Sequence, residues 1–219
     1  MFARLARPSC RLVRGASVIA CAALATTLAA CGDTGSRSRL SVADLPAIAG
    51  PAPGVPDSSW TEDGLSNPHV VTLAFLRHYW TSAAGKQALR TFLDAGFRRG
   101  ERRRWTGRVG GAEATAEVEA FLFRDDSGAR NGLGAIRELM AREPPFDNEK
   151  AKEIPVDELG EEAWGLRLSG GQEAFGYGSQ RGNVVIVVFI TCAENDGCIP
   201  GVLGKTTRAY AEEVVTRAE

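Results

Sequence analysis

The fold is decided by the stretch Val184-Val185-Ile186-Val187-Val188-Phe189-Ile190, in which every residue is apolar. A strand with one solvated face alternates apolar and polar side chains, whereas an unbroken apolar run is typical of a strand buried on both faces. We therefore expect this stretch to be the central strand of a sheet.

Three more strands are predicted before this run. Residues 113–123 alternate between apolar and mostly polar side chains, as a half-buried antiparallel strand does. Residues 163–168 and 174–177 are short strand-like segments, separated by the turn sequence Ser169-Gly170-Gly171. Strands that follow one another through short turns favour an antiparallel sheet.

Three segments, 83–95, 129–140 and 202–218, place apolar residues at helical spacing. Gly96 follows the first as a stop signal, and Pro144-Pro145 ends the second. Residues 68–80 are apolar and aromatic, and their pattern fits either a helix or a strand. The order of elements predicts the α+β class, with a single antiparallel sheet and helices packed on one face.

Leu28-Ala29-Ala30-Cys31 has the form of a lipobox, the bacterial signal that attaches diacylglycerol to a cysteine and makes it the new N-terminus. It ends an apolar stretch of about 15 residues, shorter than a membrane-spanning helix, that follows four arginines, as in a secretory signal peptide. We expect lipidation of Cys31 and anchoring to the outer face of the bacterial cytoplasmic membrane. An ordinary signal peptide with a coincidental Cys31 is the alternative.

The chain is thus predicted to have a lipoprotein signal peptide over 1–30, a lipidated N-terminus and flexible linker over 31–59, and one domain over 60–219. As a coil of about 28 residues, the linker would reach roughly 30 Å. Within it, Leu40-Ser41-Val42-Ala43-Asp44-Leu45-Pro46 is a candidate for docking on the domain, because it has three apolar residues that a spacer would not need. Without residues 1–30 the chain has 22 basic and 27 acidic residues, a net charge of −5. This charge argues against general nucleic-acid binding, which needs a basic surface.

Cys192 and Cys198 remain once the signal peptide is removed and Cys31 is lipidated. An even pair of cysteines in an oxidising compartment favours a disulfide. Metal binding by this pair is the alternative, although two cysteines with no nearby histidine supply at most half of a zinc site.

Six arginines are concentrated in residues 98–108 and form the most suggestive polar feature of the chain. Because arginine recognises phosphate and carboxylate groups, the cluster is a candidate site for lipid headgroups, wall polymers or phosphorylated ligands. The alternative is a solvated strand whose arginines form ion pairs with Glu113, Glu117 and Glu119. The arginines are Arg98, Arg99, Arg102, Arg103, Arg104 and Arg108, of which Arg98, Arg102, Arg103 and Arg104 are the candidate anion contacts.

Trp105, Phe175 and Tyr177 are candidate ligand contacts of a cleft. Phe175 and Tyr177 share one strand face, and Gly176 and Gly178 leave the opposite face open to close approach. Core packing of these aromatic residues is the alternative.

Catalytic motifs are not recognised in the sequence. His69 and His78 would face opposite ways on a helix, so a shared metal site is not expected. No serine lies in a Gly-x-Ser-x-Gly elbow, and the glycines do not have the spacing of a phosphate-binding loop. The sequence therefore predicts no catalytic residue, no cofactor and no metal.

Several short motifs occur in an order that resembles a known group of proteins. After the lipobox and the proline-bearing linker come Asp94-Ala95-Gly96-Phe97-Arg98 with Trp105, Glu119-Ala120-Phe121-Leu122-Phe123, Leu159-Gly160-Glu161-Glu162-Ala163 and Arg181-Gly182-Asn183-Val184-Val185. Over most of residues 70–218 the chain resembles extracytoplasmic lipoproteins of actinobacteria that are similar to the outer sensor domain of actinobacterial serine/threonine kinases. The resemblance implies an α+β sheet with a ligand cleft and a binding role. Those sensor domains have two disulfides, whereas this chain has cysteines for one.

The functional hypothesis is a membrane-anchored extracytoplasmic lipoprotein with a non-enzymatic ligand-binding or sensor-like domain. Its partners would be the membrane, through the lipid anchor, and an envelope ligand or protein. The alternatives are a carrier of a lipid or other apolar molecule at the cell envelope and an extracytoplasmic hydrolase.

Overall fold

An eight-stranded antiparallel sheet forms the centre of a computed structural model, which describes residues 39–54, 59–64, 69–145, 148, 150–193 and 197–219. The strand order is β1-β3-β4-β8-β7-β6-β5, with β2 paired to β3. β8 (Val184–Ala193) lies in the middle, as its apolar sequence predicts. The other strands are β1 (Thr61–Glu62), β2 (Val70–Val71), β3 (Phe97–Val109), β4 (Ala112–Phe123), β5 (Lys150–Ile154), β6 (Ala163–Ser169) and β7 (Gln172–Arg181).

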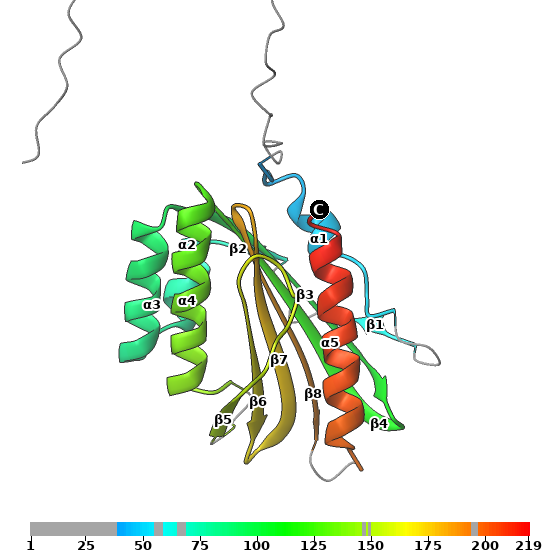
Figure 1. Cartoon of the computed structure of the whole chain (residues 1–219). Coiled ribbons are helices and arrows are strands. Elements are labelled where there is room, and N and C mark those ends of the chain that lie inside the picture. The colour runs from blue at the N-terminus through cyan, green and yellow to red at the C-terminus, as the bar shows by residue number, and fades with distance from the viewer. Residues whose placement is uncertain (1–38, 55–58, 65–68, 146–147, 149, 194–196) are drawn as a thin grey trace, which may run out of the picture. The chain divides into compact units, whose positions relative to one another are not determined.

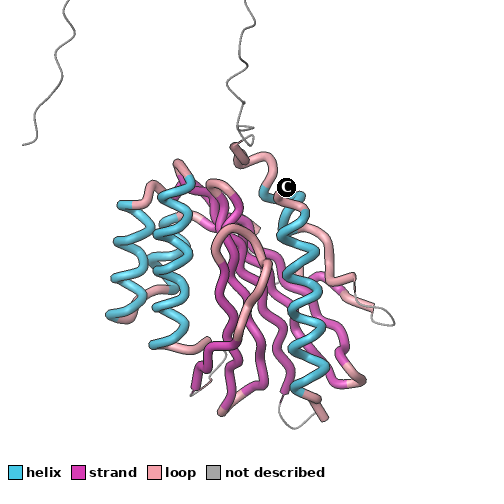
Figure 2. Tube along the Cα trace, viewed as in Figure 1, coloured by secondary structure: helices cyan, strands magenta, loops and turns pink. Residues whose placement is uncertain are grey.

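Helices cover both faces of the sheet (Figure 1). On one face α2, α3 and α4 enclose an apolar cluster rich in phenylalanine. On the other face α1 and α5 enclose a second cluster, which also contains alternate residues of β4 and β8. The helices are α1 (Leu45–Ala49), α2 (Leu73–Tyr79), α3 (Ala83–Asp94), α4 (Asp126–Arg142) and α5 (Pro200–Thr216). Figure 2 shows the same three layers by secondary structure.

The predicted α+β class, with one antiparallel sheet and helices packed against it, is confirmed. The helices lie on two faces rather than the single face expected, and β8 explains why. Along this strand Ile186 and Val188 belong to the cluster on the α5 side, whereas Val187 and Phe189 belong to the cluster on the α4 side. Because both sets are apolar, each face of the strand needs a helical cover to exclude water.

The predicted helices are confirmed, and local capping explains where they begin. The Ser82 hydroxyl accepts a hydrogen bond from the Gly85 backbone N–H at 2.9 Å and caps α3. The Asp125 carboxylate does the same for α4, at 2.8 Å from the Gly128 nitrogen. Gly96, with φ of +74°, follows α3 as the expected stop residue. The segment 68–80, whose pattern fits either a helix or a strand, contains one of each, since β2 is followed directly by α2.

Three strands are missing from the predicted order of elements. β3 is the longest of them, and its arginines hide the alternation that marks a half-buried strand. Residues 97–109 therefore form the strand that is one interpretation of the arginine cluster, and anion binding by its arginines stays a prediction. β1 and β5 are short edge strands with mostly exposed or half-buried residues, so they lack an apolar pattern.

The folded unit extends further toward the N-terminus than the predicted boundary at residue 60. Leu45 and Ile48 of α1 are each 1% exposed and belong to the cluster beneath α5. The Tyr210 hydroxyl of α5 donates to the Pro51 carbonyl at 2.9 Å. Burial of apolar side chains and this hydrogen bond hold residues 40–53 against the domain, which agrees with the docking expected for residues 40–46 and extends it to residue 53. Residues 1–38, with the signal peptide and Cys31, lie outside the described residues.

Candidate functional site

Arg102 lies near the middle of β3 and binds two carboxylates of β4. Its Nε and Nη2 donate to the two carboxylate oxygens of Glu117, at 3.0 and 2.8 Å. Its Nε also lies 3.6 Å from Oε1 of Glu119, the residue directly opposite in the strand register. Bidentate pairs of this kind are the strongest guanidinium–carboxylate contacts. The expected pairing of the arginine strand with Glu117 and Glu119 is thus confirmed for Arg102.

Glu119 is the group of this cluster that titrates near neutral pH. Burial, followed by repulsion from the neighbouring Glu117 carboxylate, raises the pKa of Glu119 to about 7, while Arg102 opposes the shift. The Phe75 ring of α2 covers the guanidinium, with 6.0 Å between Cζ and the ring centroid. Because the Glu119 side chain is 18% exposed, it can exchange a proton with solvent. The arrangement therefore offers one carboxyl group that can hold a proton near neutral pH.

A second ion cluster lies on the other side of the same strand. Arg103 donates to the buried Glu101 through Nε at 3.0 Å and to Glu62 of β1 through Nη1 at 2.8 Å. Arg104, which shares the face of Arg102, lies 4.0 Å from the carboxylate of Asp63, which follows β1. Two of the four candidate anion contacts, Arg102 and Arg103, therefore direct their donors at glutamates of the domain itself.

The arginines at the two ends of the strand are different. Arg98, Arg99 and Arg108 are exposed, and within the described part of the chain they make no ion pair. Arg98 and Arg99 open β3, and Arg108 lies near its other end. The fold thus divides the arginine cluster into a central group that forms ion pairs and two ends of the strand whose arginines form none within the described residues.

The candidate aromatic contacts lie in the core beneath α1 and α5. Trp105, which is 3% exposed, packs edge-on against Tyr210 with 6.2 Å between ring centroids. Phe175 and Tyr177 are 8% and 5% exposed and belong to the same cluster. Burial raises the pKa of Tyr177, so its hydroxyl stays protonated. These three positions match the core-packing alternative, and their role as ligand contacts stays a prediction.

The space beside the two glycines of β7 is filled by aromatic rings. A Cβ on Gly176 would lie 2.0 Å from the Phe189 ring, and one on Gly178 would lie 2.2 Å from the Trp164 ring. Both glycines are therefore required for close packing of the neighbouring strands' side chains. The close approach inferred from the sequence is real, but the approaching groups are side chains of this chain.

A groove between α3 and α4 is a concave feature that the sequence pattern did not predict. It has a volume of about 330 Å³. Small residues form its floor, and a Cβ added to Gly134 would meet no atom within 4 Å. Its lining residues are Ala84, Gln87, Ala88, Thr91, Arg130, Asn131, Gly134, Ala135, Glu138, Leu139 and Arg142. The signal that could have found it is the repeat of alanine and glycine where the two predicted helices face each other.

Polar groups make up the rim of the α3–α4 groove. Arg142 lies 3.7 Å from the Glu138 carboxylate of the preceding turn and 3.4 Å from the amide oxygen of Gln87 on α3. Arg130 is paired with Glu162 outside the groove at 2.5 Å. Such a lining can offer hydrogen-bond donors and acceptors to a small polar molecule, with an apolar floor beneath.

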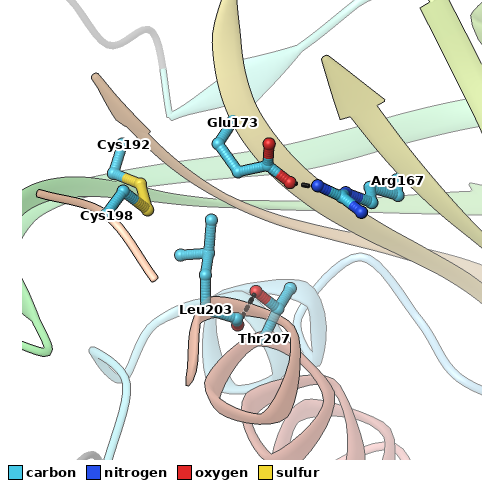
Figure 3. Close-up of a disulfide and its surroundings, with 6 residues drawn as sticks. All are labelled: Arg167, Glu173, Cys192, Cys198, Leu203 and Thr207. Atoms are coloured by element: carbon cyan, nitrogen blue, oxygen red, sulfur yellow. Dashed lines mark hydrogen bonds and ion pairs between the residues drawn. A yellow bond between two sulfur atoms is a disulfide. The ribbon is translucent and has the colours of Figure 1, made fainter. Parts of the chain in front are cut away.

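The predicted disulfide between Cys192 and Cys198 is present and joins the end of β8 to the segment before α5 (Figure 3). Leu203, in the first turns of α5, lies beside it and is fully buried. One turn further along α5, the Thr207 hydroxyl donates to the Leu203 carbonyl at 2.8 Å. The disulfide therefore fixes the start of α5 over the central strand and adds to the packing of the apolar cluster beneath it.

The histidines and acidic residues do not form a metal site in the described residues. Within these ranges, no group of three or more histidine, cysteine, aspartate and glutamate side chains is placed to hold a metal ion. His69 precedes β2 and His78 lies in α2. Among the helices of the described ranges, none has the length and apolar character needed to cross a membrane.

Similarity to known proteins is limited. No protein family and no curated protein matches the chain. Among solved structures, the extracellular domain of PknH from Mycobacterium tuberculosis is similar with a TM-score of 0.37 and 13% sequence identity. The match covers 81% of this chain and 93% of that one. At this TM-score the likeness carries no argument about fold or function.

Proposed function

We propose that the chain is a membrane-anchored extracytoplasmic lipoprotein with a non-enzymatic ligand-binding or sensor-like domain. The disulfide between Cys192 and Cys198 carries this proposal, because structural disulfides persist in oxidising compartments outside the cytoplasm. The lipobox ending at Cys31 supplies the route to that compartment and the means of staying at the membrane. Two acyl chains on one diacylglycerol give stable attachment, whereas one chain holds a protein only marginally.

The α3–α4 groove is the binding site we propose for a small polar ligand. Its volume of about 330 Å³ is at the lower limit of typical ligand sites, and its rim offers Arg142, Glu138 and Gln87. The carrier alternative requires a large apolar cavity, and the polar rim of this groove does not favour it. A lipid that copurifies with the protein would favour the carrier.

Anchoring is tested by metabolic labelling of the full chain with an alkyne fatty acid in a bacterial host. We expect the unaltered protein to be labelled and to sediment with membranes, and Cys31→Ala to lose both properties. Cys21→Ala, which lies within the predicted signal peptide, is the matched control and should keep them. A Cys31→Ala protein that is still labelled would overturn the proposed anchor.

Ligand binding is tested by native mass spectrometry after incubation with the small-molecule fraction of an envelope extract. We expect an added mass on the unaltered protein that is lost in Gly134→Leu, because the new side chain fills the groove. Ala141→Leu is exposed on the same helix outside the groove and should keep the ligand. Equal binding by both variants would remove the groove from the proposal.

A further inference from the structure

The chain enters the domain at a fixed point. The Leu40 backbone N–H donates to the Asn183 side chain at 3.1 Å, and the Asn183 amide donates back to the Leu40 carbonyl at 3.0 Å. Asn183 is 3% exposed and also donates to the Phe123 carbonyl at 3.2 Å. Residue 40 is thereby tied to one end of the sheet, where β4 ends and β7 turns into β8.

This attachment shortens the connection to Cys31. Residues 40–53 are held on the domain by α1 and by the Tyr210 hydrogen bond, so only residues 32–39 remain as spacer between the lipobox cysteine and the domain. Eight residues span at most about 29 Å when fully extended. A lipid on Cys31 therefore keeps this end of the domain within one chain length of the headgroups.

The same end of the domain carries exposed arginines. Arg98 and Arg99 open β3 directly after the turn at Gly96, and Arg124, whose backbone N–H donates to the Gly96 carbonyl, follows β4. Arg124 is paired with Asp125 at 3.0 Å. Arg98 and Arg99 have no such partner among the described residues.

Other charged residues lie near this end, among them Glu161, which accepts from the Gly182 backbone N–H, and the ion pair of Arg181 with Glu219. Arg39, next to the entry point of the chain, acts electrostatically on Asp125. Asp126 is the exposed acid that follows Asp125 at the start of α4. Arg124 and Arg39 both act on Asp125, so their charge is engaged by that acid, whereas Arg98 and Arg99 have no ion pair within the described residues and can face an external anion.

We propose that this end of the domain docks on anionic lipid headgroups, with Arg98 and Arg99 contacting their phosphates. The inference rests on the proposed lipid anchor, because the short spacer is what brings the arginines to the surface. Guanidinium groups match phosphate oxygens in geometry and charge. Each basic side chain near an anionic leaflet strengthens binding about fivefold. Docking would also fix which end of the α3–α4 groove points away from the membrane.

Arg108 provides an internal control. It lies on the same strand, is exposed, and has no ion pair within the described residues. Ten residues of strand separate it from Arg98, which places it roughly 33 Å away. If the domain docks by its chain-entry end, Arg108 stays in solvent.

Arginine footprinting tests the proposal on the full lipidated protein. The protein is incorporated into vesicles of phosphatidylcholine alone or of equal parts of phosphatidylcholine and phosphatidylglycerol. Modification of each arginine by phenylglyoxal is then followed by mass spectrometry. We expect phosphatidylglycerol to slow modification of Arg98 and Arg99 relative to phosphatidylcholine alone and to leave the rate at Arg108 unchanged. Equal rates in the two vesicle types, or equal slowing of all three arginines, would overturn the proposal.

Two further arms separate the sources of the effect. In one arm, millimolar inorganic phosphate is added to the protein on phosphatidylcholine vesicles. If phosphate slows modification of Arg98 and Arg99 and phosphatidylglycerol does not, the anion that these arginines bind is free phosphate, and docking on lipid headgroups is overturned. In R98Q/R99Q the lipid-dependent protection of Arg124 should be lost, whereas R108Q should keep it; equal protection in both variants would contradict docking through this pair.

Intact mass reports lipidation of Cys31 first, so failure of the anchor is distinguished from failure of docking. If the chain is not lipidated, the protein is mixed directly with phosphatidylglycerol vesicles. Protection of Arg98 and Arg99 would then support docking without the anchor, and its absence would overturn both the anchor and the docking that rests on it.

Discussion

Strand β4 presents two different surfaces to the two sides of the sheet. Toward α1 and α5 it offers small side chains, including Ala114, Ala116 and Ala120, each at most 5% exposed. Toward α3 and α4 it offers Phe121 and Phe123, fully buried, and further along the strand Glu117 and Glu119. The small residues let α1 approach the sheet, whereas the opposite face needs large rings to fill the space beneath two helices.

On the face of β4 that points toward α3 and α4, one half of the strand is aromatic and the other half is charged. Where α3 covers the strand, Phe92 packs against the rings of Phe97, Phe121 and Phe123. Where the short α2 provides the cover, the strand carries carboxylates that share one guanidinium. The aromatic half supplies stability through burial, and the charged half supplies a group that responds to pH.

Removing the central ring of the aromatic half should have the largest effect. Phe92→Ala is expected to lower the free energy of unfolding by about 3–5 kcal/mol, because it leaves a cavity among four aromatic neighbours. Leu93→Ala, at a neighbouring position that is 42% exposed, is the control and should cost less than about 1 kcal/mol. Urea unfolding measures both. Equal losses would mean that the aromatic half is not the stabilising one.

Breaking the charged half should cost less, and the two glutamates should differ. Glu117→Gln removes the bidentate partner of a half-buried arginine and is expected to cost about 2 kcal/mol at pH 7, below the cost for a fully buried pair because Arg102 is 20% exposed. Glu119→Gln removes a repelling carboxylate and should be close to neutral. Thermal unfolding of the two variants side by side checks the order, and a larger loss in Glu119→Gln would contradict it.

The pH dependence of stability should come from the same cluster. The pKa of Glu119 is raised to about 7 in the folded state, so between pH 5 and 7 the folded chain holds a proton that the unfolded chain has released. Its contribution is therefore greatest at low pH and falls as the pH rises through that window. Glu119→Gln should flatten this fall when unfolding is measured at pH 5 and 7.5. An unchanged profile in Glu119→Gln would assign the dependence to other groups.

The middle of this fold can be predicted from the sequence better than its margins. The run 184–190 identifies the central strand because burial on both faces leaves a strong pattern, and that same pattern should have predicted helices on both faces. β3 and its pairing with β4 are only one of two interpretations of the arginine cluster, because the arginines hide the alternation of a strand and the register that selects their partners is not given by the sequence. The helical conformation of α1 is missed because five residues beside prolines resemble a linker, although the apolar residues of this segment do indicate that it contacts the domain. The α3–α4 groove depends on how two helices face each other, which spacing alone does not give.

The contacts that hold residues 40–53 on the domain should contribute less to stability than the aromatic half or the charged half of the opposite face. Tyr210→Phe removes a hydroxyl that donates to the Pro51 carbonyl at 2.9 Å and is expected to cost about 1 kcal/mol. Hydrogen exchange should become faster in residues 45–49, since α1 loses its tie to α5. Tyr79→Phe, at a side chain that is 57% exposed, is the control and should leave that exchange unchanged. Exchange unaffected in Tyr210→Phe would show that apolar packing alone holds the segment.

The smallest predicted effect is at Gly134, which is compared with Gly132 on the other side of α4. Gly134 faces the groove, where an added Cβ meets nothing within 4 Å, so Gly134→Ala should raise the free energy of unfolding by about 0.5–1 kcal/mol through better helix propensity. Gly132 faces the sheet, where a Cβ would lie 2.2 Å from the Phe123 ring, so Gly132→Ala should destabilise by about 1–3 kcal/mol. Opposite signs for one chemical change, measured by urea unfolding, would show that packing against the aromatic half sets the outcome. Two gains would mean that the Phe123 ring yields and that this side of the sheet is less tightly packed than its ring contacts indicate.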